Sequence, residues 1–230
     1  MIEVISFFYN EEYLLPHYLK HYSYVDKITA FYDESSTDNT LKILESEPKV
    51  RIFPFKFADG LNETEKIYMI NRAYRKSKAK YCIVADADEF VFRPCFMFRN
   101  IYFCRLWQMV GDGELEIDIP IKDQLCYGYY DRLYLKPSIV KTGKRFKFKE
   151  GHHQVTRFHV KKYPFFNIVD GLHLNMISYD FYRNRMLKNR IPRQSKYNIE
   201  KGFSRQFTNR SEAEVARKYK EALDKRIKLW

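Results

Sequence analysis

The stretch CIVADADEF, residues 82–90, decides the fold of this chain, because it joins a buried strand directly to an acidic turn. Residues 82–85 are apolar without alternation, a pattern typical of a strand that is covered on both faces. Three carboxylates follow within four positions, at Asp86, Asp88 and Glu89. Carboxylates at this spacing repel one another, and burial adds to the energetic cost. We therefore expect positive charge to lie among them.

Strand-like and helix-like segments alternate along residues 1–90. We expect strands at 2–8, 27–32, 50–55 and 82–85, and helices at 11–22, 38–47 and from Asn62 onward, where Glu65 completes a capping-box-like start. This alternation predicts an α/β fold with a mainly parallel central sheet, wound in Rossmann-like fashion. Such sheets bind ligands at the carboxyl ends of their strands. Asn10, Asp33 and Asp86 fall at three such ends, and we expect them to converge on one crevice.

The second half of the sequence has a different pattern, with clustered histidines and two helical stretches after a series of β-like runs. These runs are 101–107, 133–141 and 154–160. The last helix is expected to follow Ser211, its cap, with Glu214 as its third residue. No Gly- and Pro-rich linker separates the halves. We therefore expect one domain over residues 1–230, with a soft boundary near residues 95–100.

Composition bounds the class of protein. With 230 residues and 45% hydrophobic content, the chain is long enough for one domain with a full core. Its net charge of +12 indicates either attraction to polyanions, such as nucleic acid, anionic lipid or phosphate-bearing molecules, or simply a basic soluble surface. Four cysteines without a CxxC pair favour reduced thiols in a cytosolic protein. We expect neither a secretory leader nor a membrane span, since the sequence has no signal-peptide pattern and no run of 18 apolar residues.

Asp86 and Asp88 flank one small residue, so both carboxylates can turn toward the crevice. Hard oxygen ligands at this spacing suit Mg²⁺ or Mn²⁺, which keep coordination positions for water and for substrate phosphates. The alternative is a pair of solvated loop acids or helix caps, but the strand context and the basic chain favour the metal. Asp33, within YDESSTDNT (32–40), is placed to accept hydrogen bonds from a nucleoside.

Three segments in this order and spacing resemble family 2 glycosyltransferases of GT-A fold. They are FFYNEEYLLPHYLKHY (7–22), YDESSTDNT (32–40) and CIVADADEF (82–90). The match is closest to a small branch associated with bacterial surface-polysaccharide synthesis. The later segments RLYLKPSIVKTGKRFKFKEGHHQV (132–155) and LHLNMISYDFYRNRMLK (172–188) are similar to histidine-containing segments of that branch, less specifically.

The resemblance implies a division of labour within one GT-A domain. Residues 1–98 would bind the nucleotide sugar and the metal, and residues 99–230 would bind the acceptor and supply the C-terminal helices. The nucleotide sugar would be bordered by Tyr9, Asn10, Glu11, Asp33 and Asp86, with Asp33 at the uracil or ribose. Asp88 would bind the metal directly, Asp86 would lie near the ribose and the metal, and His173 would complete the metal site.

Two further segments offer catalytic groups. His152 and His153 are adjacent, and in a strand they would point to opposite faces, so one is expected to be packed and the other to face the cleft. The sequence leaves open which is which. Asp112 lies between two glycines in GDGELEID (111–118), which indicates a mobile loop with an exposed carboxylate. We weigh Asp112 as an acceptor-side general base against an ordinary acidic turn.

The resemblance thus implies a metal-dependent, inverting glycosyltransferase that moves a sugar from a nucleotide sugar, expected to be a UDP-sugar, to a hydroxyl of a glycan or lipid-linked acceptor. Basic runs at 141–149 and 183–196 form either a solvated face or a surface for diphosphate, an anionic acceptor or an anionic membrane. We expect a cytoplasmic protein, with peripheral contact to the inner face of the membrane, and no nucleic-acid partner. The rivals are a sugar-nucleotidyltransferase, which usually needs a Gly-rich N-terminal loop that is missing before Gly60, and a basic nucleic-acid-binding protein or metal-dependent nuclease.

Overall fold

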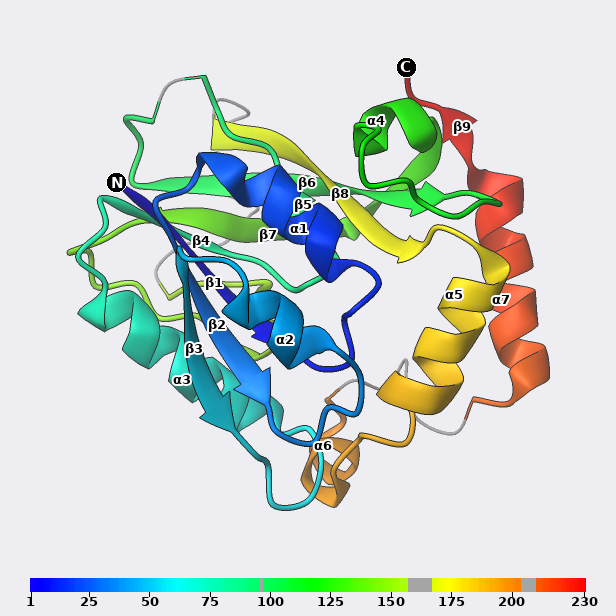
Figure 1. Cartoon of the computed structure of the whole chain (residues 1–230), viewed down its shortest axis with the longest axis horizontal. Coiled ribbons are helices and arrows are strands. Elements are labelled where there is room, and N and C mark those ends of the chain that lie inside the picture. Colours follow the sequence, from blue (N-terminus) through cyan, green and yellow to red (C-terminus); the bar gives the residue numbers. More distant parts are fainter. Residues whose placement is uncertain (96, 157–166, 204–209) are drawn as a thin grey trace.

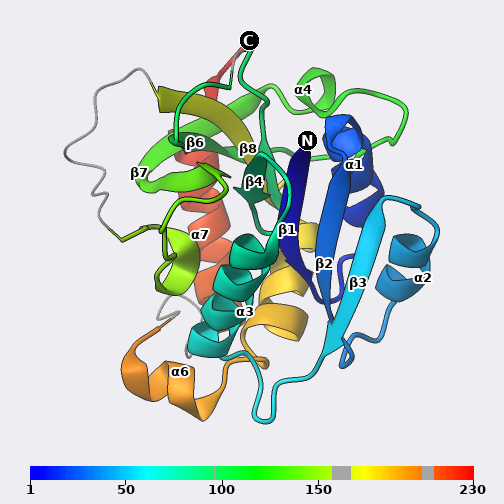
Figure 2. The ribbon, with the colours of Figure 1, turned by 90° about the vertical axis from the view of Figure 1, so that its left-hand side faces the viewer.

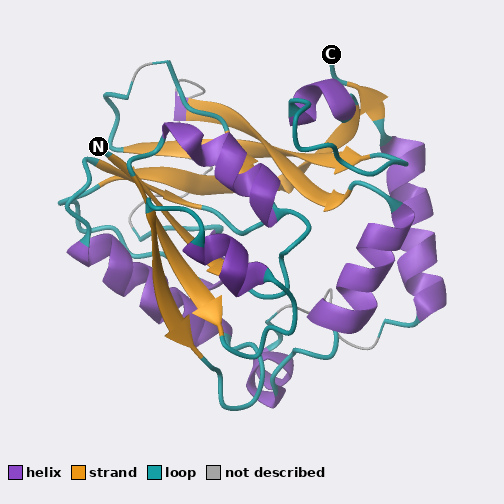
Figure 3. Cartoon of the chain, in the orientation of Figure 1, coloured by secondary structure: helices purple, strands orange, loops and turns teal. Residues whose placement is uncertain are grey.

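The computed structural model describes residues 1–95, 97–156, 167–203 and 210–230 (Figures 1 and 3). Its elements in chain order are β1 (Ile2–Phe8), α1 (Leu15–His21), η1 (Tyr22–Tyr24), β2 (Lys27–Asp33), α2 (Thr40–Glu45), β3 (Val50–Phe55), α3 (Glu63–Lys76), β4 (Tyr81–Val84), β5 (Glu89–Val91), β6 (Ile101–Val110), α4 (Ile121–Gln124), β7 (Tyr127–Lys141), η2 (Glu150–His152), β8 (Ile168–Met176), α5 (Tyr179–Asn184), the π-helical turn η5 (Arg185–Arg190), α6 (Lys196–Lys201), α7 (Glu212–Lys225) and β9 (Ile227–Lys228).

The first half forms the parallel part of the sheet that the alternating pattern predicts. Strands β3, β2, β1 and β4 lie side by side in that order, and every neighbouring pair is parallel. Helices α1 and α2 cover one face of these strands and α3 covers the other, as Figure 2 shows. The α/β class and its mainly parallel core are therefore confirmed.

Apolar clusters on the two faces explain the pattern of the buried strand at 81–84. Tyr81 and Ile83 pack into the cluster that includes Leu15 and Leu44 of α1 and α2. Cys82 and Val84 instead pack into the cluster on the α3 side. Because successive side chains of a strand point to opposite faces, a strand between two covered faces is apolar at every position.

The second half extends the same sheet with mixed strands. Within the described residues the order is β3-β2-β1-β4-β7-β6-β8-β5, and β9 pairs with β7. Strand β7 is antiparallel to β4 and β6, β8 is parallel to β6, and β5 is antiparallel to β8. In Figure 1 the strands β6 and β8 run across β1–β3. Residues 99–230 therefore contribute more regular structure than their sequence indicates.

The acidic turn forces this sheet to curl. Only residues 85–88 separate β4 from β5, although three strands lie between them in the sheet. In a flat sheet β5 would lie roughly 19 Å from β4, at about 4.8 Å for each step between strands. The connecting residues cannot extend that far, because Glu89 N donates to Asp86 O at 3.0 Å to close a tight turn. The acidic residues therefore lie where the two parts of the sheet face each other.

Several local expectations are met, and others differ. Asn62 caps α3, and Ser211 and Glu214 form a capping box at α7. Helix α1 begins at Leu15 rather than near Glu11, since Pro16 fits best in the first helical turn. Val155 forms only an isolated bridge with Phe148, and the rest of the run expected at 154–160 lies largely outside the described residues.

The four cysteines are free thiols, as expected; Cys82 and Cys104 are buried. Among the described residues, no helix combines the length and apolarity that a membrane crossing requires.

Replacing Tyr22 with Phe tests the attachment of the acidic turn. The buried Tyr22 hydroxyl donates to Glu89 O at 2.8 Å and accepts from Val91 N at 2.9 Å, so it satisfies the backbone of β5. Its loss is expected to lower the free energy of unfolding by about 1–3 kcal/mol, measured by urea denaturation. Tyr68→Phe is the control, because Tyr68 is 65% exposed. Equal stability of both variants would show that this bridge contributes nothing.

Candidate active site

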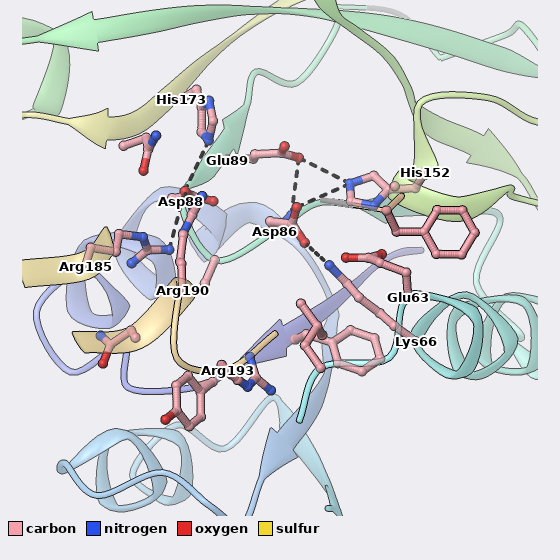
Figure 4. Close-up of a pocket in the computed structure, with 18 of the residues that line it drawn as sticks. Glu63, Lys66, Asp86, Asp88, Glu89, His152, His173, Arg185, Arg190 and Arg193 are labelled. Atoms are coloured by element: carbon pink, nitrogen blue, oxygen red, sulfur yellow. Dashed lines mark hydrogen bonds and ion pairs between the residues drawn. The ribbon is translucent and has the colours of Figure 1, made fainter. Parts of the chain in front are cut away.

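A cavity of about 870 Å³ opens at the carboxyl ends of β1 and β4. Figure 4 labels ten of its lining residues, which come from α3, the acidic turn with the start of β5, η2, β8 and the segment from η5 to Arg193. Basic residues outnumber acidic ones in the lining, which suits an anionic ligand. The acidic members are Glu11, Glu63, Asp86, Asp88, Glu89 and Glu150, and the basic ones are Lys66, Lys136, Lys149, Arg185, Arg190, Arg193, Arg210 and Lys218.

Asp86 lies between two lysines. Lys66 Nζ donates to its Oδ1 at 2.8 Å, and Lys136 Nζ lies 3.8 Å from Oδ2. Burial alone would raise the pKa of Asp86, but Lys66, His152 and Lys136 hold it well below its ordinary value. These cations therefore favour the anionic form of the Asp86 carboxylate.

Glu89, Lys136 and His152 form a buried cluster beside Asp86. Lys136 donates to Glu89 Oε1, and its Nζ lies 3.4 Å from His152 Nε2. One ligand atom each from Asp86, Glu89 and His152 lies within 4.8 Å of the others, a spacing at which a metal ion can be held. Burial would raise the pKa of Glu89, but Lys136 and His152 together outweigh burial and lower the pKa to about 2. The ammonium of Lys136 thus supplies a positive charge within this trio.

Asp88 belongs to a second cluster on the other side of the turn (Figure 4). Its Oδ2 lies 3.1 Å from His173 Nε2, 2.5 Å from Arg190 Nη2 and 3.3 Å from Arg185 Nη2. Burial would raise the pKa of Asp88, yet Arg190, His173 and Arg185 hold it well below its ordinary value. Arg185 also pairs with Glu11 at 2.5 and 2.7 Å.

The two clusters supply the positive charge that the acidic turn requires. Lys66, Lys136 and Arg190 come from α3, β7 and η5, each remote in sequence from the turn. They neutralise Asp86, Glu89 and Asp88 respectively. A buried charge is tolerated when it is paired and hydrogen-bonded. Each acid of the turn therefore has a cationic partner within the chain.

His173 is oriented by a second contact. Its Nδ1 lies 2.8 Å from Gln108 Oε1 on the neighbouring strand β6. Because an amide oxygen only accepts, Nδ1 carries the proton of that bond, and Nε2 is the atom that faces Asp88. Metal-binding histidines are commonly held in this way, with the outer N–H donated to a carbonyl or carboxylate.

Asp33 reaches the cavity through an arginine. Its carboxylate accepts from Arg193 and from Ser35, whose backbone N and hydroxyl lie 3.0 and 2.6 Å from Oδ1. The guanidinium of Arg193 lies 3.9 Å from the centroid of the Tyr9 ring. Asp33 is 2% exposed, whereas Tyr9 and Arg193 line the cavity. Asp33 therefore holds Arg193 beside Tyr9 in the cavity wall.

Asn10 and Glu11 lie at the boundary of the cavity with a smaller hollow of about 470 Å³. Glu11 lines both spaces, while Asn10 lines only the smaller one. Asn10 adopts a left-handed φ of 50°. Its Oδ1 accepts from Thr37 N at 2.8 Å, and this contact fixes the loop after β1 against the loop after β2.

Asp112 lies away from the residues that line this cavity. Its side chain is 70% exposed and pairs with Arg226 at 3.3 Å. The structure therefore does not bring Asp112 together with Asp86, Asp88 and His173.

The expectation for His152 and His153 rested on a strand, and the structure places them at the end of η2 instead. Both line the cavity: His152 is 2% exposed and His153 is half-buried. The assumption that only one of them faces the cleft is therefore wrong.

Sequence reasoning missed Lys66 and Lys136 as site residues. It gave the 183–196 run, three of whose four arginines line the cavity, only as a solvated face or a surface for a diphosphate, an anionic acceptor or a membrane. A lysine within the otherwise apolar run LYLKPSIV (133–140) is the signal that points to Lys136. The sequence of the arginine run did not decide between these alternatives, because such runs also form solvated faces.

Comparisons with known proteins give likeness at the level of the fold. A scan against protein-family models finds no match, and no curated protein matches the chain. Among solved structures, S. aureus TarS 1-349 in complex with UDP matches 80% of this chain at 13% identity and a TM-score of 0.46; this chain spans 63% of it. TarS 1-349 with UDP-GlcNAc matches 97% of this chain and 72% of its own length at 13% identity, with a TM-score of 0.44.

The galactosyltransferase LgtC, in complex with donor and acceptor sugar analogs, matches 45% of this chain and 46% of its own length at 9% identity, with a TM-score of 0.29.

Lys136→Met is expected to lower the free energy of unfolding by about 3–5 kcal/mol at pH 7, since Glu89 is left buried and charged. In the wild type, burial raises the pKa of Glu89, but Lys136 and His152 together outweigh burial and lower this pKa to about 2, below its ordinary 4.5. The pairing therefore contributes fully above pH 4.5 and is lost as the pH falls toward 2.

The deficit of Lys136→Met should consequently shrink on acidification, and urea denaturation at several pH values measures it. The double variant with Glu89→Gln is the control, and it is expected to recover part of the loss at pH 7. A deficit that is the same at every pH, in both variants, would contradict this account.

Proposed function

We propose that this chain is a glycosyltransferase that transfers a sugar from a nucleotide diphosphate sugar, a UDP-sugar, to an acceptor hydroxyl, with a divalent ion as cofactor. One observation carries the proposal: Asp86 and Asp88 from the end of β4, and Asp33 through Arg193 from the end of β2, converge on one cavity with an excess of basic residues. Carboxylates for a metal and arginines for phosphates are the two kinds of group that a nucleotide diphosphate requires. The three ordered sequence segments support the same assignment.

The nucleoside is assigned to the wall of Tyr9 and Arg193. An aromatic ring and a planar guanidinium at 3.9 Å offer flat faces for a base. Asp33 fixes Arg193 in that position and is the acceptor proposed for uracil or ribose. Glu11 and Asn10 close the adjoining edge, and Arg185 holds Glu11.

Asp88 and His173 fit a divalent ion. Their facing atoms, Oδ2 and Nε2, lie 3.1 Å apart, which suits two ligands of one ion at about 2.1 Å each. Gln108 holds His173 with Nε2 inward, the arrangement that ligating histidines adopt. Carboxylate and imidazole together suit Mn²⁺. When bound, such an ion supplies positive charge to the diphosphate leaving group.

The trio of Asp86, Glu89 and His152 fits an ion less well, since Lys136 is ion-paired with Glu89 at its centre and is 4% exposed. We therefore assign Asp86 to the ribose side and to Lys66. Lys66 and Arg190 are the cations closest to Asp86 and Asp88, and they are proposed to face the diphosphate.

In the proposed reaction an acceptor hydroxyl attacks the anomeric carbon, the bond to the diphosphate breaks, and the carbon is inverted. The hydroxyl proton passes to a carboxylate or histidine of the cavity. Asp112 is not included, because its carboxylate pairs with Arg226 outside the cavity. A glycan or lipid-linked glycan acceptor, as in surface-polysaccharide synthesis, follows from the sequence resemblance.

Asp88→Asn is expected to abolish transfer and to remove the effect of Mn²⁺ on UDP binding, because an amide is a poor ligand for the ion and leaves Arg190 without a counter-charge. Calorimetric titration of UDP with and without Mn²⁺ measures this. Asp118→Asn is the control, since the Asp118 side chain is 98% exposed. Mn²⁺-stimulated binding of UDP that persists in Asp88→Asn would exclude Asp88 as a ligand.

Asp33→Ala is expected to weaken UDP binding by about 1.5–3 kcal/mol, the range for losing a hydrogen bond with a charged group. The loss has two sources, the acceptor for the nucleoside and the position of Arg193 beside Tyr9. Glu34→Ala, an exposed neighbour, is the matched control and should bind UDP normally. Unchanged or tighter binding by Asp33→Ala would count against this wall as the nucleoside site.

A further inference from the structure

Four residues that line the cavity have a buried polar atom without a hydrogen-bond partner among the described residues: Glu63 Oε2, His152 Nδ1, Asn175 Oδ1 and Arg185 Nε. Two of them, Glu63 and His152, lie on the same side of Asp86 (Figure 4) and are 9% and 2% exposed. Both residues line the cavity. Leaving such an atom buried without a partner has a free-energy cost of about 1–3 kcal/mol, so each unsatisfied atom in a native structure calls for an explanation. A ligand that supplies the missing partners is the simplest one.

Glu63 is held in place by its backbone. Glu63 is the first residue of α3 and follows the N-cap Asn62. Its backbone N–H donates at 3.0 Å to Oδ1 of the fully buried Asn198. The carboxylate points toward Asp86 and Lys66 in Figure 4. When the Glu63 carboxylate is ionised, its Oε2 accepts hydrogen bonds and cannot donate them.

His152 is held in a strained conformation, with a φ of 43° in a region that non-glycine residues seldom adopt. Its Nε2 lies 3.4 Å from Lys136 Nζ. Nε2 also lies 3.6 Å from Glu89 Oε2 and 3.7 Å from Asp86 Oδ2. When Nε2 accepts from the Lys136 ammonium, or when both ring nitrogens are protonated, Nδ1 carries a proton. The unsatisfied Nδ1 is consequently a donor.

The wall therefore offers one acceptor and one donor. A hydroxyl both donates and accepts and can satisfy both atoms, whereas a phosphate only accepts and would be repelled by Glu63. Figure 4 places Glu63 and His152 on one side of Asp86, and Asp88 and His173 on the other. A ligand that carries phosphates on one side and hydroxyls on the other matches this arrangement.

We propose that Glu63 and His152 form the subsite for hydroxyl groups of the donor sugar. This inference rests on the proposed function, and it adds the residues that distinguish a nucleotide sugar from the free nucleotide. Glu63 is a binding residue here, and the charge of its carboxylate favours a neutral, hydroxyl-bearing sugar.

The test compares two ligands that differ only in the sugar. UDP and three probes, UDP-glucose, UDP-galactose and UDP-GlcNAc, are titrated into the full chain with Mn²⁺, and the probe that binds most tightly relative to UDP is kept. Glu63→Ala should weaken that probe roughly 10- to 100-fold, the loss of one charged hydrogen bond, and leave UDP within about 2-fold. Glu63→Gln, which keeps the shape, should show a smaller loss of the same kind.

Glu65→Ala is the matched control, because Glu65 lies in the same first turn of α3 but is exposed and accepts from Asn62 instead. It should leave both ligands unaffected. Equal weakening of UDP and of the probe by Glu63→Ala, or no weakening of either, would overturn the subsite. Normal probe binding with lost turnover in Glu63→Gln would also overturn it, and would make Glu63 the general base.

The failure of the proposed function has a different signature. If the wild-type chain binds neither UDP nor any of the three probes, the nucleotide-sugar assignment fails and this subsite fails with it. If the wild type binds UDP and a probe equally well, the proposed function stands and the sugar subsite alone is wrong.

Discussion

The pairing of the buried acidic turn with cations from the same chain is the interaction on which the structure depends. Asp86, Asp88 and Glu89 would repel one another if they were unpaired, and burial would force protonation. Lys66, Lys136, Arg185 and Arg190 remove this conflict. Since these cations come from α3, β7 and η5, the charge balance links both halves of the chain at one point. The ion pairs of the site therefore also hold the two halves of the fold together.

The backbone also fixes the positions of the charged residues. The short connection from β4 to β5 curls the sheet so that β8, which carries His173, faces the end of β4. Glu89 and His173 are direct neighbours in the pairing of β5 with β8. Glu89 and His173, which are far apart in the sequence, therefore meet because the four residues between β4 and β5 form a tight turn. On this geometry we base the proposed division of the cavity into a nucleoside wall, a centre for phosphates and an opposite wall for hydroxyls.

Much of this arrangement can be predicted from the sequence. The strands and helices through residue 84 follow from apolar periodicity and from caps such as Asn62, which depend on local chemistry alone. The pairing of Asp88 with His173 was expected only through the family resemblance. Strand β5 has too few residues for a pattern, and its pairing with β8 is set by tertiary structure. The arginine partners of the acidic residues could not be assigned from the sequence, because a basic run has the same pattern on a solvated surface and in a binding site. Asp112 is the opposite case: its position between two glycines suggested a catalytic loop, but the structure shows an exposed carboxylate that pairs with Arg226.

The central claim is that Asp88 and His173 bind the divalent ion beside a nucleotide diphosphate, while Lys136 takes that place among Asp86, Glu89 and His152. A crystal structure with UDP and Mn²⁺, with the ion located by its anomalous scattering, tests it most directly. The account predicts one peak at about 2.1–2.3 Å from Asp88 and His173, in contact with the diphosphate. A peak held by Asp86, Glu89 and His152 with Lys136 displaced, or UDP bound outside this cavity, would contradict it.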